Sequence, residues 1–223
     1  MDVHPLSLGL LGLVLIGLPL QAFRTQRSGR ALALTRSQLY VAAAIPQGFL
    51  LALLALVVWV EGEGRPSLGL TLERPGLAGW TLLVVLGGVL VGAAANALRR
   101  ALDLDESPLV RHLIPRSGRE KLIFGLLVAP TAGIVEELLF RGFATSRLLA
   151  LAPAWVALAV PGIAFALAHA YQGWLGFVRA GLLGALLTLP FCVTGSVLPS
   201  IAAYTVLDLL VGLVLARWLV TEG

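Results

Sequence analysis

Long apolar segments with few charges recur along the whole chain, and they constrain its fold more than any other feature of the sequence. They cover residues 6–23, 39–60, 77–98, 155–170, 174–191 and 198–220, and a further one begins at Leu122. A helix of about 20 residues is long enough to cross the hydrocarbon core of a bilayer. The sequence therefore predicts an all-α polytopic membrane protein with about seven transmembrane helices, within a range of about six to eight.

The composition agrees with a membrane protein and excludes other classes. Of the 223 residues, 58% are hydrophobic and 13% are charged, whereas soluble domains carry about 25% charged residues. The net charge of +4 does not indicate nucleic-acid binding, because no basic face with interleaved aromatic residues accompanies it. Cys192 is the only cysteine, so neither an intrachain disulfide nor a cysteine metal cluster can form.

Basic residues set the predicted orientation. The polar segments 24–36 and 99–121 hold most of the Lys and Arg residues, and both lie on one side if every span crosses the membrane. The positive-inside rule assigns such loops to the cytoplasm, so the N-terminus is expected outside and the C-terminus inside. The N-terminus lacks the basic region of a signal peptide, so the first apolar segment is expected to be retained.

A proline is expected to interrupt the segment that begins at Leu122. Pro130 has no backbone N–H and its ring clashes with the preceding helical turn. The helix is therefore expected to break or start there, which would leave residues 122–129 interfacial or re-entrant.

Charged residues inside the apolar segments mark the candidate site. Glu136, Glu137 and Arg141 lie in one such segment, where ionisable groups are costly and usually functional. Glu137 and Arg141 are four residues apart and can pair on one helix face. Glu136 points about 100° away, so it is expected to be free to act on a water molecule or ligand.

A second polar position, His169, is predicted to lie at the same depth as Glu136. Glu136 is 17 residues before the turn at Pro153 and His169 is 16 residues after it, so in an antiparallel helix pair both lie roughly 25 Å from that turn. A carboxylate and an imidazole at one depth can form an acid–base pair or two metal ligands. The alternative for His169 is an interfacial histidine at a helix end.

A third polar group lies in the last apolar segment. Tyr204 and Asp208 are four residues apart and share a helix face. A buried carboxylate needs a partner, and His169 or Arg179 could provide one for Asp208. Arg179 can instead extend to the cytoplasmic interface.

These residues resemble the motifs of one family of intramembrane proteases, the CPBP (CAAX protease and bacteriocin-processing, or Abi) family. The sequence Glu136-Glu137-Leu-Leu-Phe-Arg141 resembles its EExxxR motif, and Phe165-Ala-Leu-Ala-His169 its FxxxH motif. The likeness covers residues 120–215 as a catalytic core, with 1–119 as variable N-terminal spans of one transmembrane domain.

The resemblance implies a bacterial inner-membrane endopeptidase of the glutamate type. Its catalytic residues would be Glu136, His169, Tyr204 and Asp208, supported by Glu137, Arg141 and Phe165. Its substrate would be a membrane-associated peptide or protein, such as a prenylated tail, a bacteriocin leader or a sorting tail. Tyr204 replaces the histidine that is usual in the third motif, which favours a metal-independent mechanism in which its hydroxyl donates to an oxyanion. The alternative is a divalent metal held by Glu136, His169 and Asp208.

Two other functions also fit these residues. A non-catalytic descendant, such as an immunity or scaffold protein, would bind a membrane peptide in the same cavity, and the exchange to Tyr204 supports that reading. A transporter or proton relay would also use buried Glu, His and Asp residues. Against the transporter, the apolar segments show no inverted repeat.

Overall fold

The computed structural model describes residues 4–215, which fold almost entirely into helices. Within these residues, six helical segments are long and apolar enough to span a membrane, and the chain is an all-α integral membrane protein. They are Pro5–Ser28 (α1, Pro5–Gly12; η1, Leu13–Gly17; α2, Leu18–Ser28), Arg36–Val60 (α3), Leu77–Ala101 (α4), Gly118–Leu151 (α6 to α8), Ala170–Thr194 (η6, Ala170–Gln172; α10, Gly173–Thr194) and Leu198–Leu215 (α11, Leu198–Leu209; η7, Leu210–Leu215). The predicted span at 198–220 ends outside the described residues.

The predicted span 155–170 is shorter than the others. It forms α9 (Ala154–Ala168), which has 15 residues and is therefore about 22 Å long, less than the hydrocarbon core. The chain then reverses at His169 and returns through α10. Because α9 stops short, His169 lies among the other helices instead of at the end of a full span.

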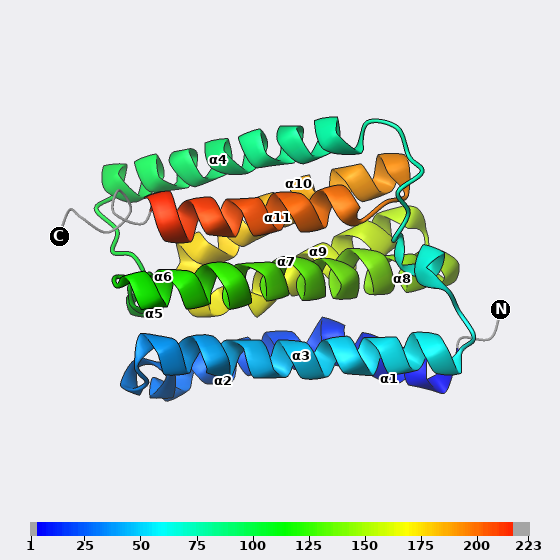
Figure 1. Cartoon of the computed structure of the whole chain (residues 1–223), viewed down its shortest axis with the longest axis horizontal. Coiled ribbons are helices and arrows are strands. Elements are labelled where there is room, and N and C mark those ends of the chain that lie inside the picture. Colours follow the sequence, from blue (N-terminus) through cyan, green and yellow to red (C-terminus); the bar gives the residue numbers. More distant parts are fainter. Residues whose placement is uncertain (1–3, 216–223) are drawn as a thin grey trace.

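The helices form two layers (Figure 1). One layer holds α4, α11, the α6–α8 segment and α3, and the other holds α10, α9 and the α1–α2 helix. Within the first layer α7 (Ala129–Glu137) packs against both α11 and α3. In the second layer α9 packs against α10 and α2. The helix that carries Glu136 is thus flanked by α11 and α3, and its continuation η5 packs against α9.

The expected interruption at Pro130 is absent. Residues 118–151 continue as one helix through α6 (Gly118–Ile123), η4 (Phe124–Val128), α7, η5 (Leu138–Thr145) and α8 (Ser146–Leu151). The prediction failed because η4 is a π-helical turn. It ends two residues before the proline and widens the backbone where the ring would clash. Residues 122–129 are therefore part of the span.

A glycine brings the two central helices close together. A Cβ atom at Gly133 of α7 would collide with the hydroxyl of Thr205 and lie 3.1 Å from the carbonyl oxygen of Ile201, both in α11. Only a residue without a side chain permits this approach. Glu136 lies one turn after Gly133, and Tyr204 directly precedes Thr205, so this contact brings their side chains within reach of each other.

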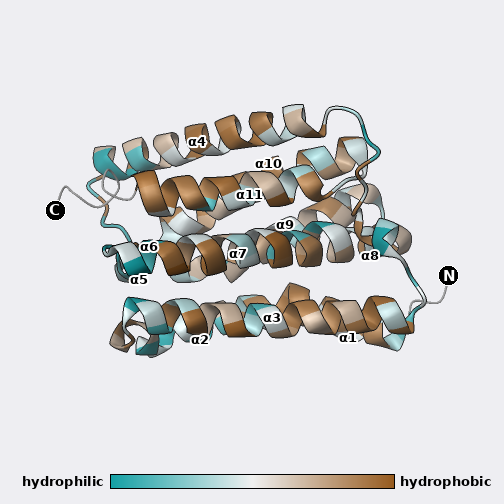
Figure 2. Ribbon diagram, viewed as in Figure 1, coloured by the Kyte–Doolittle hydropathy of each residue, from teal (hydrophilic) through white to brown (hydrophobic). Residues whose placement is uncertain are grey.

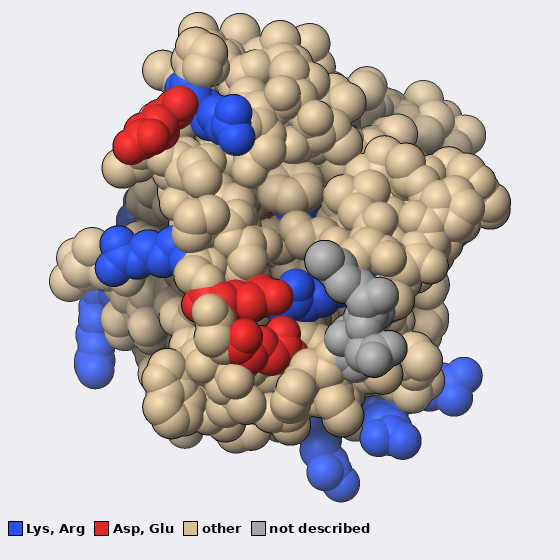
Figure 3. All heavy atoms as spheres, turned by 90° about the vertical axis from the view of Figure 1, so that its right-hand side faces the viewer, with Lys and Arg blue, Asp and Glu red and all other residues tan. Residues whose placement is uncertain are grey.

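Polar residues gather at the two ends of the bundle and apolar residues cover its middle (Figure 2). The end where α2 and α4 finish and α3 and α6 begin carries most of the basic residues, including Arg24, Arg27, Arg30, Arg36, Arg99, Arg100, Arg116, Arg119 and Lys121. Figure 3 shows the opposite end, where acidic side chains gather against a basic one.

An ion-pair network joins three segments at this opposite end. Arg147 of α8 donates to Glu61 at 2.8 Å and to Glu63 at 2.7 Å, just after α3. It also donates to the hydroxyl of Ser7 in α1, which in turn donates to Glu61. The network therefore ties α1 and the end of α3 to α8.

Candidate active site

Three polar side chains from three helices meet inside the bundle. Glu136 of α7, His169 at the end of α9 and Tyr204 of α11 converge, although 68 residues separate the first from the last. The hydroxyl of Tyr204 donates to Oε2 of Glu136 at 2.8 Å. Nε2 of His169 lies 3.3 Å from that hydroxyl and 3.6 Å from the same carboxylate oxygen. The 3.6 Å separation is too long for a direct hydrogen bond between the imidazole and the carboxylate.

Backbone geometry fixes the tautomer of His169. Its Nδ1 lies 2.9 Å from the carbonyl oxygen of Phe165, one turn earlier in α9. A carbonyl only accepts, so Nδ1 carries the proton, and in the neutral ring Nε2 is left as an acceptor. The carboxylate of Glu136 and Nε2 of His169 are therefore two acceptors on the same side of the site. A water molecule that donates to both would be oriented for deprotonation.

Phe165 links the site to a buried ion pair. Its ring lies 4.5 Å from the ring of His169 and 6.1 Å from that of Tyr204, measured between centroids. The guanidinium of Arg141 lies over the same ring, 4.4 Å from its centroid. Phe165 therefore packs between the polar site and Arg141.

Arg141 and Glu137 form the ion pair that their spacing predicts. Nη1 of Arg141 donates to Oε1 of Glu137 at 2.7 Å, and both side chains are almost completely buried. Arg141 also donates to the carbonyl oxygen of Gly184 at 2.7 Å and to the Thr188 hydroxyl at 3.3 Å, both in α10. The pair joins α7 to α10 behind the site, while Glu136 points away from it.

A fourth residue, which the sequence analysis missed, contacts the site from α3. Nε2 of Gln47 donates to Oε1 of Glu136 at 3.0 Å. The carboxylate is therefore held at both oxygens, by Gln47 on one and Tyr204 on the other. A signal existed in the sequence, because Gln47 is an amide inside the apolar segment 39–60, and polar residues within spans usually have a function.

Asp208 lies near the site but is not joined to it. It is one helical turn beyond Tyr204 and interacts electrostatically with Glu136. Within residues 4–215 it makes no hydrogen bond or ion pair, so neither of its two possible partners, His169 and Arg179, pairs with it.

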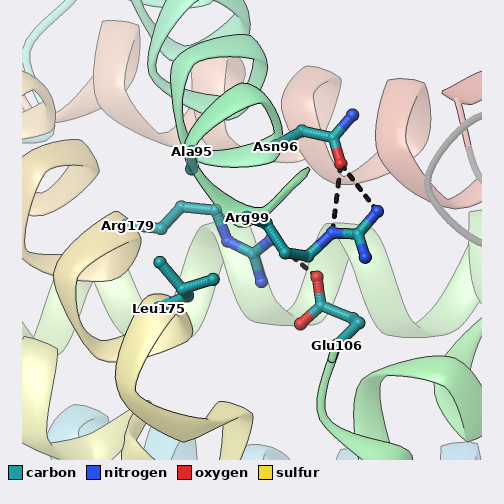
Figure 4. A pocket seen from close by; sticks show the side chains of 6 residues that line it. All are labelled: Ala95, Asn96, Arg99, Glu106, Leu175 and Arg179. Atoms are coloured by element: carbon teal, nitrogen blue, oxygen red, sulfur yellow. Dashed lines mark hydrogen bonds and ion pairs between the residues drawn. The ribbon is translucent and has the colours of Figure 1, made fainter. Parts of the chain in front are cut away.

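Arg179 lines a separate polar recess near the basic end (Figure 4). It donates to the side-chain oxygen of Gln172 at 2.9 Å and lies 3.6 Å from the carboxylate of Glu106, in the connection after α4. The alternative in which Arg179 lines the Glu136 cavity is therefore not observed. The ring of Tyr171 stacks 6.0 Å from that of His169, and its hydroxyl accepts a hydrogen bond from Gln172, the partner of Arg179.

The candidate metal ligands do not form a ligand group. In the described part of the chain, no three His, Cys, Asp or Glu side chains come together in an arrangement that could hold an ion, and this includes Glu136, His169 and Asp208. The polar groups instead form the hydrogen-bonded set of carboxylate, phenol, imidazole and amide.

The fold and the site define a class: a helical integral membrane protein with a carboxylate, an imidazole and a phenol gathered inside the bundle. Residues 118–210 match the family described as type II CAAX prenyl endopeptidase Rce1-like. This match supports the resemblance to the CPBP (CAAX protease) family that the motifs predict. The matched segment runs from the start of α6 to the first residue of η7, so it includes Glu136, His169 and Tyr204 but not Gln47. No curated protein and no solved structure matches the chain.

Proposed function

We propose that this chain is an intramembrane endopeptidase that hydrolyses a membrane-associated peptide or protein with a water molecule activated by Glu136 and His169. The observation that carries the proposal is the convergence of three side chains, in which Tyr204 lies 2.8 Å from Glu136 and 3.3 Å from His169. The match of residues 118–210 to the prenyl endopeptidase family supports the same reaction class.

The two acceptors, the Glu136 carboxylate and Nε2 of His169, support a first step in which they activate a water molecule. The water donates one hydrogen to the Glu136 carboxylate and the other to Nε2 of His169, which Phe165 holds in the correct tautomer. The water oxygen attacks the peptide carbonyl carbon as Glu136 takes the proton. The carbonyl oxygen becomes an oxyanion of the tetrahedral intermediate.

Tyr204 is assigned to the oxyanion. In the resting site its single O–H donates to Glu136. Once Glu136 has gained the proton of the water it is a weaker acceptor, so the phenol can turn its hydrogen toward the oxyanion. The C–N bond then breaks, and the proton passes from Glu136 to the leaving amine. Overall, the acyl carbon gains OH and the amine gains H.

The basic end of the bundle is proposed to face the cytoplasm of a bacterial inner membrane, as the positive-inside rule predicts. His169 lies near the end of α9 that is closer to this side. The substrate would therefore be cleaved toward the cytoplasmic side of the hydrocarbon core. A prenylated tail, a bacteriocin leader or a sorting tail would each meet this requirement.

The proposal is tested by comparing protein termini in membranes that contain the wild type or Glu136→Gln. The matched control is Glu73→Gln, which makes the same change at an exposed carboxylate. We expect a set of new termini in the wild type and in Glu73→Gln that is missing in Glu136→Gln at equal protein level. If the termini persist in Glu136→Gln, the assignment is wrong.

A non-catalytic peptide-binding function is the second candidate, and the presence of Tyr204 in place of the usual histidine favours it. Tyr204→His restores the family's usual residue. If neither the wild type nor this variant cleaves any peptide while a peptide still co-purifies with both, the binding function replaces the enzymatic one.

A further inference from the structure

One buried polar atom beside Glu136 has no partner. Oε1 of Gln47 is buried and receives no hydrogen bond from any described residue. An unsatisfied buried acceptor destabilises the fold, and native proteins keep few of them. It belongs to the same amide that donates to Glu136, so covalent geometry keeps it within a few ångströms of that carboxylate.

The orientation of this amide follows from the carboxylate that it contacts. An ionised carboxylate can only accept hydrogen bonds, so the amide nitrogen of Gln47 must face Oε1 of Glu136. The amide oxygen therefore faces away from the carboxylate and offers an acceptor next to the proposed reacting groups.

Gln47 is half-buried and lies on the face of α3 that points into the bundle. The buried residues of α3 include Tyr40, Leu50 and Leu54, and Gln47 is seven residues after the first and seven before the last. Residues seven apart share a helix face, so Gln47 lies on the inward stripe of α3. An aliphatic side chain there would pack against α7 without an orphan acceptor.

We propose that Gln47 is a substrate-binding residue whose amide oxygen accepts a hydrogen bond from a backbone N–H beside the scissile bond. This inference rests on the proposed function. A peptide in a membrane satisfies its N–H groups internally as a helix, and it must unwind before its carbonyl carbon can be attacked. Unwinding frees backbone N–H groups, and Oε1 of Gln47 accepts one of them while Nε2 still holds Glu136. Gln47 thus couples the position of the substrate backbone to that of the carboxylate.

The contact predicts a specificity that depends on one substrate atom. A substrate residue without an N–H at this position, such as a proline or a residue preceded by a backbone ester, loses the hydrogen bond. The loss should lower kcat/KM for the wild type about tenfold, the effect of one hydrogen bond worth about 1.4 kcal/mol.

The test combines a variant with a backbone change in the substrate. The protein is reconstituted in nanodiscs, and a pool of short hydrophobic fluorogenic peptides is screened for cleavage that Glu136→Gln abolishes. One such peptide is then made as a series in which an ester replaces each backbone amide other than the scissile one in turn. Each member is measured with the wild type, Gln47→Met and Gln21→Met, the same change at an exposed position in α2. Gln47→Asn, which withdraws the amide by one methylene group, is the second variant if Gln47→Met does not fold.

We expect one ester position to lower kcat/KM about tenfold for the wild type and Gln21→Met and to have little further effect on Gln47→Met. If every ester position affects the wild type and Gln47→Met equally, the contact does not exist, although the proposed protease function stands. If no peptide is cleaved, binding of the pool to the same nanodiscs is measured by fluorescence anisotropy. If binding depends on one ester position in the wild type but not in Gln47→Met, the Gln47 contact is supported and the proposed protease function is contradicted. The absence of both cleavage and binding would contradict the Gln47 contact and the proposed protease function.

Discussion

The hydroxyl of Tyr204 donates to Oε2 of Glu136 at 2.8 Å, across the contact between α11 and α7. The phenol thus contacts the residue proposed as the general base. Its O–H is the nearest donor to that carboxylate oxygen, since Nε2 of His169 is an acceptor.

Removal of this hydroxyl should affect the rate more than substrate binding. Tyr204→Phe keeps the ring against Phe165 and deletes only the O–H. We expect kcat to fall about a hundredfold to a thousandfold, the usual cost of one oxyanion donor, with KM little changed. The measurement is steady-state kinetics with a peptide that the wild type cleaves. An unchanged kcat would show that Tyr204 plays no part in the chemistry.

The close approach of α7 and α11 gives a second prediction. Gly133→Ala places a methyl group against the Thr205 side chain and the α11 backbone, and such overpacking costs about 1–3 kcal/mol. We expect a lower Tm and a large loss of activity, because Glu136 moves away from Tyr204. The matched control is Gly162→Ala, since a Cβ there meets no atom within 4 Å. Equal Tm and activity in the two variants would mean that the approach is not required.

Substitutions of the buried pair Glu137 and Arg141 should have non-additive effects on the free energy of unfolding. Arg141→Met alone leaves a buried carboxylate without its cation, and we expect a loss of about 3–5 kcal/mol of unfolding free energy. Glu137→Gln combined with Arg141→Met leaves no uncompensated charge and should cost less than Arg141→Met alone. Denaturant unfolding in detergent measures the unfolding free energies of the wild type, the two single variants and the double variant. If the double variant is the least stable of the set, a structural role limited to charge compensation is wrong.

The network of Arg147 with Glu63 predicts a pH dependence at the opposite end of the bundle. The hydrogen bond from Arg147 lowers the pKa of Glu63 below its ordinary value of 4.5. A carboxyl whose pKa is depressed in the folded state stabilises it above the ordinary value and loses that effect as pH falls through the folded pKa. Between about pH 5 and pH 3 the Tm of the wild type should therefore fall more steeply than that of Glu63→Gln. Parallel curves would contradict the prediction.

Much of the site could be predicted because its geometry is local to helices. The spacing of four between Glu137 and Arg141 gives an ion pair, and equal distances from Pro153 give Glu136 and His169 a common depth, which the 3.6 Å separation matches. Both inferences need only helix geometry. Their roles in catalysis, like the division of the chain at residue 120, stay predictions.

The features that the sequence did not predict depend on contacts between distant segments. Gln47 reaches Glu136 only because α3 packs on α7, and the pairing of Arg179 with Glu106 depends on how the connection after α4 folds back. The continuity of the helix through Pro130 depends on a π turn, for which the sequence has no simple signal. These features come from tertiary packing, which local spacing does not report.

The most direct test of hydrolysis at this site is mass spectrometry of products formed in water enriched in oxygen-18. The reconstituted wild type and Glu136→Gln are each incubated with a peptide that the wild type cleaves. The account predicts that the new C-terminal carboxylate of the wild-type product gains one oxygen-18 atom and that Glu136→Gln forms no product. The same labelled product at the same rate from Glu136→Gln would contradict the account.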